Sequence, residues 1–388
     1  MSSTDWPEIT VRDVRLFEVA LPLREPFQIS GGSMAVRRSY IVEVEDEAGS
    51  LGWGESAPFE APFYSEETLA SVRACLLDLL APRVVGRTLS GPEQLHTLLG
   101  EGVRGNRMAR AGIDTAYWDL LARRARVSLA DVVSKRLGQL GLPAAARASR
   151  ATIECGIALG IPESGRLEDL ARDVVDGLRA GFRRVKIKVR PGWDADAVRT
   201  ARDAIRSTGS TAPLWADANG SFDLHRDRGR LEALDATDLV FLEQPFQADA
   251  LWDMTMWNRT ARVPVCLDET LVSDDVARQV VDMGGPLIWN LKIQRLGGLE
   301  EACRVYARGI KAGARMWVGT MPETGLGAQA ALAVASFPMA YPSDVEPSAR
   351  WYRDAHDVVS LRMSDDGLMK VPAVPPVPRR DGWTAIGR

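Results

Sequence analysis

The chain has 388 residues, of which 46% are hydrophobic and 26% are charged, and its formal net charge is −4. This length exceeds that of one typical domain, so we expect a large domain with a smaller one beside it. The mildly acidic balance offers no basic surface for nucleic acid or an anionic membrane, which favours a small-molecule partner.

The sequence also lacks obvious targeting signals and cysteine motifs. Its first residues show no secretory pattern and no apolar run reaches bilayer length, so we expect a cytoplasmic protein without membrane contact. The four cysteines have no Cys-x-x-Cys spacing, and we expect them to be buried free thiols.

The first part of the chain has the pattern of a small α+β unit. Residues 11–57 alternate apolar and polar side chains, which is typical of an antiparallel sheet. Apolar residues then recur at helical spacing over 66–80 and 107–125. We expect this unit to span residues 1–140, and the alanine-rich stretch after it indicates a connector.

Beyond the connector, strongly apolar strands alternate with helices. Helices are expected over 167–181 and over 273–284, the second with Ser273 as its N-cap. Repeated β-α units of this length favour a closed parallel barrel over residues 148–345. The proline-containing tail, 346–388, is expected to pack back on the N-terminal unit. The predicted barrel strands are 152–159, 183–189, 213–219, 238–244, 264–269, 287–293, 315–320 and 339–344.

Three acidic residues, Asp217, Glu243 and Asp268, end three of these strands at nearly even intervals. A barrel collects the C-terminal ends of its strands on one face, so the three carboxylates would meet there. They would repel one another strongly unless a cation lay among them. An all-oxygen set favours Mg²⁺ or Mn²⁺ over Zn²⁺ and leaves positions for water and a substrate carboxylate.

Three lysines bracket these carboxylates in the sequence. Lys186 and Lys188 lie on the same face of one strand, and Lys292 should approach from across the barrel. We expect crowding with Lys186 and the metal ion to lower the pKa of Lys188. A free amine beside a bound carboxylate is suited to removing the α-proton. Two lysines on opposite faces of one carbon permit racemisation, whereas one lysine with an electrophilic partner permits elimination.

The ordered motifs of the chain resemble the enolase superfamily, muconate-lactonizing subgroup. The resemblance implies an α/β fold, namely a modified TIM barrel, (β/α)7β, with an N-terminal α+β capping domain that the C-terminal tail completes. A lysine base beside Mg²⁺ is an established pattern of this superfamily. The motifs are GWGES and GNRMARAGIDTAYWDLLAR in the N-terminal unit, then VKIKVRPGWD, DAN, EQP, LDE, NLKIQRLGG and GTMPETGLG.

The resemblance also implies roles for individual residues. The three strand-end carboxylates match ligands of Mg²⁺, with Mn²⁺ as the other candidate. Lys188 matches the acid/base on one face, Lys186 a residue that assists it, and Lys292 the lysine on the other face. Asn219 matches a position that orients ligands. Glu269 follows a ligand by one residue, so we expect strand alternation to turn it outward, behind the ligands.

Within the subgroup, the segments PFQISGG, GNRMA, PGWD and KIQRLGG look most like the o-succinylbenzoate synthase and N-acylamino acid racemase branch. This implies a Mg-dependent lyase or isomerase that removes the proton α to a carboxylate to give a metal-stabilised enediolate. The reaction expected is dehydration to o-succinylbenzoate in the menaquinone pathway, racemisation of N-acylamino acids, or both. Muconate cycloisomerase and dipeptide epimerase are alternatives with the same half-reaction. A non-catalytic barrel would have broken ligands, and this sequence has none.

The segments GTMPETGLG and PSDVEPSARWY depart from that branch near the expected substrate pocket. Asp344 and Glu346 resemble, imperfectly, the Asp-x-Asp with which dipeptide epimerases hold a substrate amine. The loop over 26–35 is expected to close over the pocket, and the aromatic residues of FEAPFYS to form a lid or pack the cap's own core. The resemblance also implies a homo-oligomer. The expected substrate contacts are Arg295, Glu323, Ser30, Phe59 and Tyr64.

Overall fold

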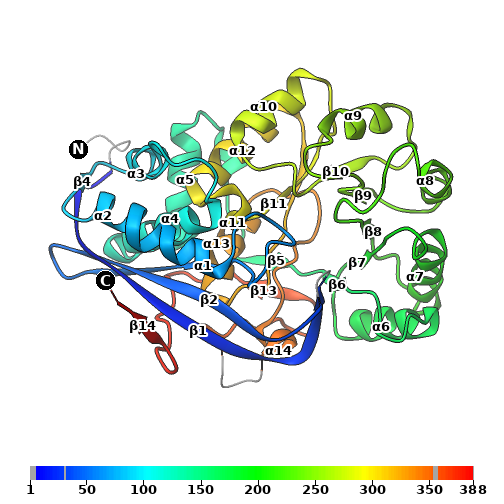
Figure 1. Ribbon diagram of the computed structural model, residues 1–388, viewed down its shortest axis with the longest axis horizontal. Helices are drawn as coiled ribbons and strands as arrows, with labels where there is room; N and C mark the ends of the chain where they lie inside the picture. The colour runs from blue at the N-terminus through cyan, green and yellow to red at the C-terminus, as the bar shows by residue number, and fades with distance from the viewer. Residues whose placement is uncertain (1–5, 30–31, 353–356, 388) are drawn as a thin grey trace.

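The computed structural model describes residues 6–29, 32–352 and 357–387. Figure 1 shows an N-terminal sheet with helices packed on it at the left, and parallel strands ringed by further helices toward the right. Of the described helices, none has an apolar stretch long enough to cross a bilayer. The four cysteines are buried free thiols, as predicted.

The N-terminal unit is built on antiparallel strands in the order β14-β1-β2-β3, with β4 pairing β1. Gly52 and Gly54 of β3 let helix α4 lie directly against the sheet, because a Cβ at either position would fall 2.3 Å from an atom of that helix. The strands are β1 Ile9–Ile29, β2 Gly32–Asp46, β3 Leu51–Ser56, β4 Thr88–Leu89 and β14 Thr384–Ile386.

The helices of this unit follow the predicted pattern with one shifted start. Helix α4 has the predicted bounds, whereas the helix expected from residue 66 begins at Leu69, because the side chain of Thr68 accepts a hydrogen bond from Ser71 N and caps it. The helices are α1 Leu69–Ala74, the π-helix η1 Cys75–Leu80, α2 Ala81–Val84, α3 Pro92–Gly100, α4 Arg107–Ala125, α5 Leu129–Gln139 and the 3-10 helix η2 Ala144–Arg147.

The second part is a parallel sheet in the order β12-β11-β10-β9-β8-β7-β6, in which consecutive strands are neighbours. Its strands are β6 Ile157–Leu159, β7 Val185–Lys188, β8 Leu214–Asp217, β9 Leu242–Glu243, β10 Val265–Leu267, β11 Ile288–Leu291 and β12 Arg315–Val318. Its helices are α6 Leu167–Arg179, α7 Ala195–Ser207, α8 Arg228–Asp235, α9 Leu251–Thr260, α10 Asp274–Asp282, α11 Ile293–Leu296, α12 Leu299–Ala312 and α13 Gly325–Ala335. Ser273 caps α10, as predicted.

The predicted eighth strand, 339–344, is not a regular strand. It makes a single bridge, between Ser343 and Cys155, because Pro342 has no N–H to donate to a ladder. The segment still closes the ring. On one side Asp344 N donates to Val318 O of β12 at 2.9 Å, and on the other Gly156 N, beside β6, donates to Ser343 O at 2.8 Å. The predicted fold class, a modified barrel with an N-terminal cap, is confirmed.

The first predicted barrel strand is divided into two. β5, Thr152–Glu154, pairs antiparallel with β13, Leu368–Lys370, of the tail, and only β6 joins the barrel. The tail also forms α14, Ser348–Trp351, and then β14, which pairs antiparallel with β1. The C-terminal segment therefore contacts both parts of the molecule.

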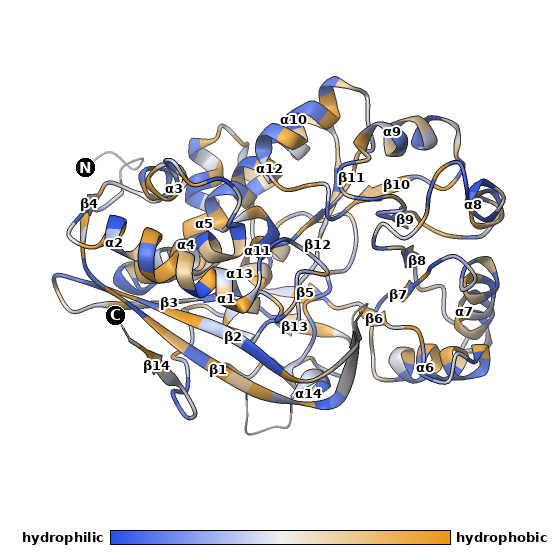
Figure 2. Ribbon diagram, viewed as in Figure 1, coloured by the Kyte–Doolittle hydropathy of each residue, from blue (hydrophilic) through white to orange (hydrophobic). Residues whose placement is uncertain are grey.

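The barrel interior below the strand ends is filled by aromatic side chains. Trp215, Phe241, Trp317 and Tyr341 form one buried cluster, in which the rings of Trp215 and Phe241 lie 4.5 Å apart. Figure 2 shows hydrophobic residues along the barrel strands and more hydrophilic residues on outer helices such as α8. This cluster excludes water from beneath the strand ends and lowers the local dielectric constant there.

Candidate active site

The three predicted carboxylates meet at the C-terminal ends of neighbouring strands. Asp217 ends β8, Glu243 ends β9, and Asp268 follows β10. Backbone register places Asp217 beside Glu243. One oxygen from each carboxylate lies within 4.8 Å of the others, and all three residues are at most 1% exposed. We call these residues the triad.

The backbone after the triad residues is held in unusual conformations. Asn219 and Gln244 have positive φ values of 43° and 39°, which non-glycine residues adopt at a cost. Gln244 Oε1 accepts hydrogen bonds from Asp268 N at 3.0 Å and Thr270 N at 3.2 Å. This buried amide ties the end of β9 to the end of β10, and so fixes two triad residues relative to each other.

Lys188 lies at one side of the triad. Its Nζ donates to Asp217 Oδ2 at 2.7 Å and to Asn219 Oδ1 at 2.5 Å. Among the protein's own groups, burial opposes the charge of Lys188, yet the adjacent Asp217 carboxylate outweighs burial and raises the pKa. The lowering that we predicted includes the effect of a metal ion and stays a prediction.

Lys186 points at the triad from the same strand but has a different main partner. Its Nζ lies 2.5 Å from Asp344 Oδ2 and 3.6 Å from both Asp217 Oδ2 and Glu243 Oε2. Burial lowers the pKa of Lys186, although Glu243 and Asp217 act in the other direction. The crowding predicted between Lys186 and Lys188 is therefore relieved by a carboxylate that lies outside the triad.

Lys292 lies at the other side of the triad, as the N-cap of α11. Its Nζ donates to Asp268 Oδ2 at 2.8 Å and to the Tyr64 hydroxyl at 3.3 Å. Arg295 donates to the other oxygen of Asp268 and to Leu271 O. Burial disfavours the charge of Lys292, but Asp268 more than compensates and raises its pKa well above the usual value. Arg295, expected to contact substrate, is thus bound to a triad residue.

The pKa values of the triad carboxylates are shifted in different directions. Burial and Asp217 raise the pKa of Glu243 to about 7. Burial acts against ionisation of Asp268 as well, but Lys292 and Arg295 outweigh it and lower the pKa. Three buried carboxylates in one place repel one another when all are charged, and the two whose pKa is lowered, Asp217 and Asp268, are those with an ammonium within 2.8 Å.

Glu269 does not turn outward, as strand alternation had predicted. β10 ends at Leu267, so alternation no longer applies at Glu269, and Asn219 Nδ2 donates to its Oε1 at 2.8 Å. Burial and the neighbouring Asp268 and Asp217 carboxylates raise the pKa of Glu269 to about 8. Lys188, Asn219 and Glu269 consequently form one hydrogen-bonded row along the edge of the site.

Of the other four residues expected to contact substrate, one reaches the triad, two are buried elsewhere or without a hydrogen bond to it, and one is not described. Tyr64 reaches the site from the cap, with its hydroxyl 3.5 Å from Asp268 Oδ1. Phe59 is buried in the cap core against Phe63, with ring centroids 4.6 Å apart. Glu323 is 7% exposed, and its Oε2 makes no hydrogen bond within the described part of the chain. Ser30 lies outside the described residues.

Sequence analysis missed Gln244 and also Asn290, which contacts a triad carboxylate. Its Nδ2 donates to Glu243 Oε1 at 2.7 Å. Asn290 precedes Lys292 by two positions, so strand periodicity placed it on the same face and gave a usable signal. Asn290 thus holds one oxygen of Glu243, Oε1, whereas Lys186 lies 3.6 Å from the other, Oε2.

The triad fits a hard divalent cation. Its donors are all carboxylate oxygens, and Glu243 Oε2 is a buried atom without a hydrogen-bond partner among the described residues. Mg²⁺ and Mn²⁺ prefer such oxygen ligands at about 2.1 Å and keep further positions for water or substrate. Asn290 orients Glu243, and the Lys188–Asn219 pair borders Asp217, so the ligands are held from behind.

Comparisons with known proteins agree with this geometry. Residues 11–134 match the family model for the N-terminal domain of mandelate racemase / muconate lactonizing enzyme, and residues 167–376 match the enolase C-terminal domain-like model. The o-succinylbenzoate synthase of Bacillus subtilis is 33% identical over 368 residues, which cover 95% of this chain and 93% of that protein.

Two further matches are similar in extent. The N-succinylamino acid racemase of Thermus thermophilus is 35% identical over 366 residues, 94% of this chain and 92% of that protein. The solved structure of an unknown member of the enolase superfamily from Enterococcus faecalis superposes with a TM-score of 0.83 at 31% identity. It covers 95% of this chain and 94% of that one.

Proposed function

Because the chain belongs to the mandelate racemase / muconate lactonizing enzyme family of the enolase superfamily, whose enzymes act on small carboxylates, we propose that it removes the proton α to a substrate carboxylate. The observation that carries this proposal is the placement of Lys188 and Lys292 on opposite sides of one triad. A carbon atom held above the triad would have an amine on each face. We assign the roles below on that basis.

Asp217, Glu243 and Asp268 would hold Mg²⁺ or Mn²⁺, which when bound supplies Lewis acidity toward the substrate carboxylate. Lys188 must first release the proton that Asp217 stabilises on its amine. The neutral amine then takes the α-proton on its nitrogen, and the substrate becomes an enediolate. Lys292 faces the opposite side and contributes positive charge close to the developing anion. Asn219, hydrogen-bonded to Lys188, fixes the direction of that amine.

We propose dehydration to o-succinylbenzoate, racemisation of N-succinylamino acids, or both as the overall reaction. The names of the B. subtilis and T. thermophilus relatives support these two outcomes. In the dehydration, Lys188 removes the proton and returns it to the departing hydroxyl group, so that water leaves and a carbon–carbon double bond forms. In the racemisation, Lys292 gives a proton to the opposite face of the same carbon.

Dipeptide epimerase activity is less well supported by the residues at the eighth strand position. An epimerase needs carboxylates for the substrate amine, but Asp344 is bound by Arg184 and Lys186. Glu346 accepts hydrogen bonds from Ala158 N at 2.9 Å and Arg350 Nε at 2.6 Å. Since both carboxylates have partners inside the protein, we rank substrates whose nitrogen is acylated above those with a free amine.

The test is deuterium exchange at the α-carbon in D₂O with Mg²⁺. The substrate panel is N-succinylamino acids, dipeptides, muconate and the cyclohexadiene carboxylate that yields o-succinylbenzoate. We expect exchange or turnover with the succinylated compounds, loss of both on chelation, and recovery with Mg²⁺ or Mn²⁺. A protein that exchanges only dipeptide or muconate protons would overturn the substrate assignment, and one that exchanges none would overturn the proposed reaction.

A further inference from the structure

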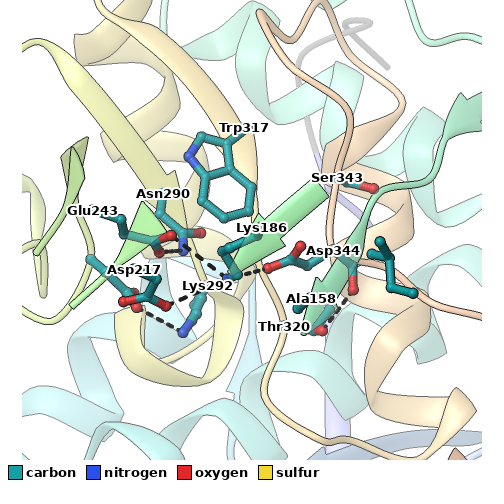
Figure 3. A network of polar contacts seen from close by, with 12 residues as sticks. Ala158, Lys186, Asp217, Glu243, Asn290, Lys292, Trp317, Thr320, Ser343 and Asp344 are labelled. Atoms are coloured by element: carbon teal, nitrogen blue, oxygen red, sulfur yellow. Dashed lines mark hydrogen bonds and ion pairs between the residues drawn. The ribbon is translucent and has the colours of Figure 1, made fainter. Parts of the chain in front are cut away.

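Lys186 lies between carboxylates on two sides, as Figure 3 shows, with Asp217 and Glu243 on one side and Asp344 on the other. Its Nζ is 2.5 Å from Asp344 Oδ2 but 3.6 Å from the nearest oxygens of Asp217 and Glu243. The ammonium is therefore hydrogen-bonded to Asp344 and only within electrostatic reach of the triad.

Asp344 is itself held firmly. Its backbone N donates to Val318 O at 2.9 Å, and its backbone O accepts from Thr320 Oγ1 at 3.0 Å. Its second carboxylate oxygen, Oδ1, accepts from Arg184 Nη2. Because Asp344 has contacts through its backbone and through both carboxylate oxygens, it cannot follow Lys186 toward the triad.

Arg184 is a buried anchor for this carboxylate. It is 0% exposed, donates to Ile157 O at 2.8 Å and has its guanidinium carbon 4.3 Å from the centre of the Trp215 ring. Arg184 directly precedes β7 and lies two positions before Lys186, so the two side chains point the same way. Asp344 thus balances two buried cations that this segment directs into the barrel.

Without Asp344, the flexible Lys186 side chain would have the triad as its nearest anions. Moving about 1 Å would bring its ammonium into hydrogen bonds with Asp217 and Glu243. The ammonium would then occupy oxygens that a divalent cation needs, and its positive charge would repel that cation.

We propose that Asp344 is a positioning residue, which holds the Lys186 ammonium away from the triad so that Asp217 and Glu243 keep oxygens for a divalent cation. This inference rests on the proposed function, since it presumes a metal site at the triad. It assigns Asp344 to metal affinity rather than to substrate binding.

Calorimetric titration with Mn²⁺ tests the inference, first on the unchanged protein. Absence of Mn²⁺ uptake there would refute the metal site, and with it the proposed function. Given uptake, we expect Asp344→Asn to weaken Mn²⁺ binding by roughly 10- to 100-fold, the range for residues that orient metal ligands. Unchanged affinity in a folded Asp344→Asn protein would refute the positioning role alone.

Removing the lysine separates positioning from a general loss of structure. We expect Lys186→Met to bind Mn²⁺ within about threefold of the unchanged protein, because its ammonium is already held off the triad. In the double variant with Asp344→Asn, which removes one charge of each sign, the affinity should recover to that level. Weak binding that persists in the double variant would overturn the inference, as would a large gain in Lys186→Met alone.

A matched control comes from the same segment. Glu346→Gln changes a carboxylate that is similarly buried but is bound by Ala158 N and Arg350 instead of Lys186. We expect its Mn²⁺ affinity to equal that of the unchanged protein, and Asp344→Glu to recover part of the loss. An equal loss in Glu346→Gln would show that the segment acts through folding and would refute the specific role of Asp344.

Discussion

On the β7 side of the triad, the Lys188 side chain is 33% exposed and its amine meets one carboxylate and one amide. On the β11 side, the Lys292 side chain is 7% exposed and lies beneath Tyr64, whose ring centre is 4.9 Å from Nζ. Arg295 shares Asp268 with Lys292, whereas Lys188 shares Asp217 with no arginine at hydrogen-bond distance among the described residues. The two sides use the same residue type in unlike surroundings.

This difference indicates unequal work for the two lysines. Lys188 is accessible enough to exchange its proton with solvent or a leaving group. Lys292 is enclosed with an anionic partner that strongly favours its charged form, so it is suited to stabilising negative charge. Elimination needs one neutral amine and one cation, so only Lys188 must release its proton. Racemisation requires Lys292 to release its proton as well, so binding of substrate must weaken the hold of Asp268.

The largest expected effect comes from Lys188→Ala. Loss of a general base typically costs about 10²- to 10⁴-fold. Exchange of the α-proton should fall by that factor for the dehydration substrate and for the N-succinylamino acid enantiomer whose α-proton faces Lys188. Exchange in D₂O followed by mass spectrometry measures it. Mn²⁺ binding serves as the control and should persist, because Lys188 is not a ligand. Exchange at the original rate would remove Lys188 from the base role.

Lys292→Ala should separate the two proposed reactions. We expect dehydration to slow by about 10²- to 10³-fold, the usual cost of losing a group that stabilises developing charge. With N-succinylamino acids, one enantiomer should still exchange its α-proton through Lys188, while interconversion of the enantiomers stops. Chiral chromatography alongside exchange provides the measurement. Equal loss of exchange from both enantiomers would contradict the assignment of one lysine to each face.

The elements that could be predicted from the sequence were those with local signals. Helix α4 has the predicted bounds, because its apolar positions recur over five turns. The triad residues could be located because each ends an apolar run, which marks the C-terminal end of a buried strand. The lysine face of β7 followed from alternation alone.

The features that could not be predicted depend on tertiary contacts. Glu269 was misplaced because where β10 ends is decided by pairing with its neighbours, and alternation fails beyond that end. The effect of the protein's own groups on the pKa of Lys188 depends on how near Asp217 lies, and no sequence spacing gives that distance. Asp344 reaches Lys186 from a segment more than 150 residues away, through a ring closure with only one strand bridge.

Asn219→Ala would sharpen the comparison by removing the neutral partner of Lys188. Asn219 joins the amine to Glu269, so its loss leaves Lys188 with Asp217 alone. We expect kcat to fall by roughly 10- to 100-fold with little change in KM. The reason is that Asn219 no longer orients the Lys188 amine toward the α-carbon, while substrate binding is kept. Asn219→Asp is the matched variant and should be at least as slow, since added negative charge raises the pKa of Lys188 further. An unchanged kcat would show that Asp217 suffices to aim the base.

The smallest expected effect is that of Tyr64→Phe, on the enclosed side. The hydroxyl lies 3.3 Å from Lys292 Nζ and 3.5 Å from Asp268 Oδ1, which are long hydrogen bonds. Losing them should cost about 0.5–1.5 kcal/mol, or roughly 2- to 12-fold in rate, while the aromatic ring stays over the ammonium.

Tyr64→Leu also removes the ring and should cost more, since the Lys292 ammonium then becomes more exposed. If enclosure explains the difference between the two lysines, Tyr64→Leu will slow racemisation and dehydration and leave Lys188-dependent exchange at its original rate. An equal loss of that exchange would place Tyr64 at the substrate rather than over Lys292.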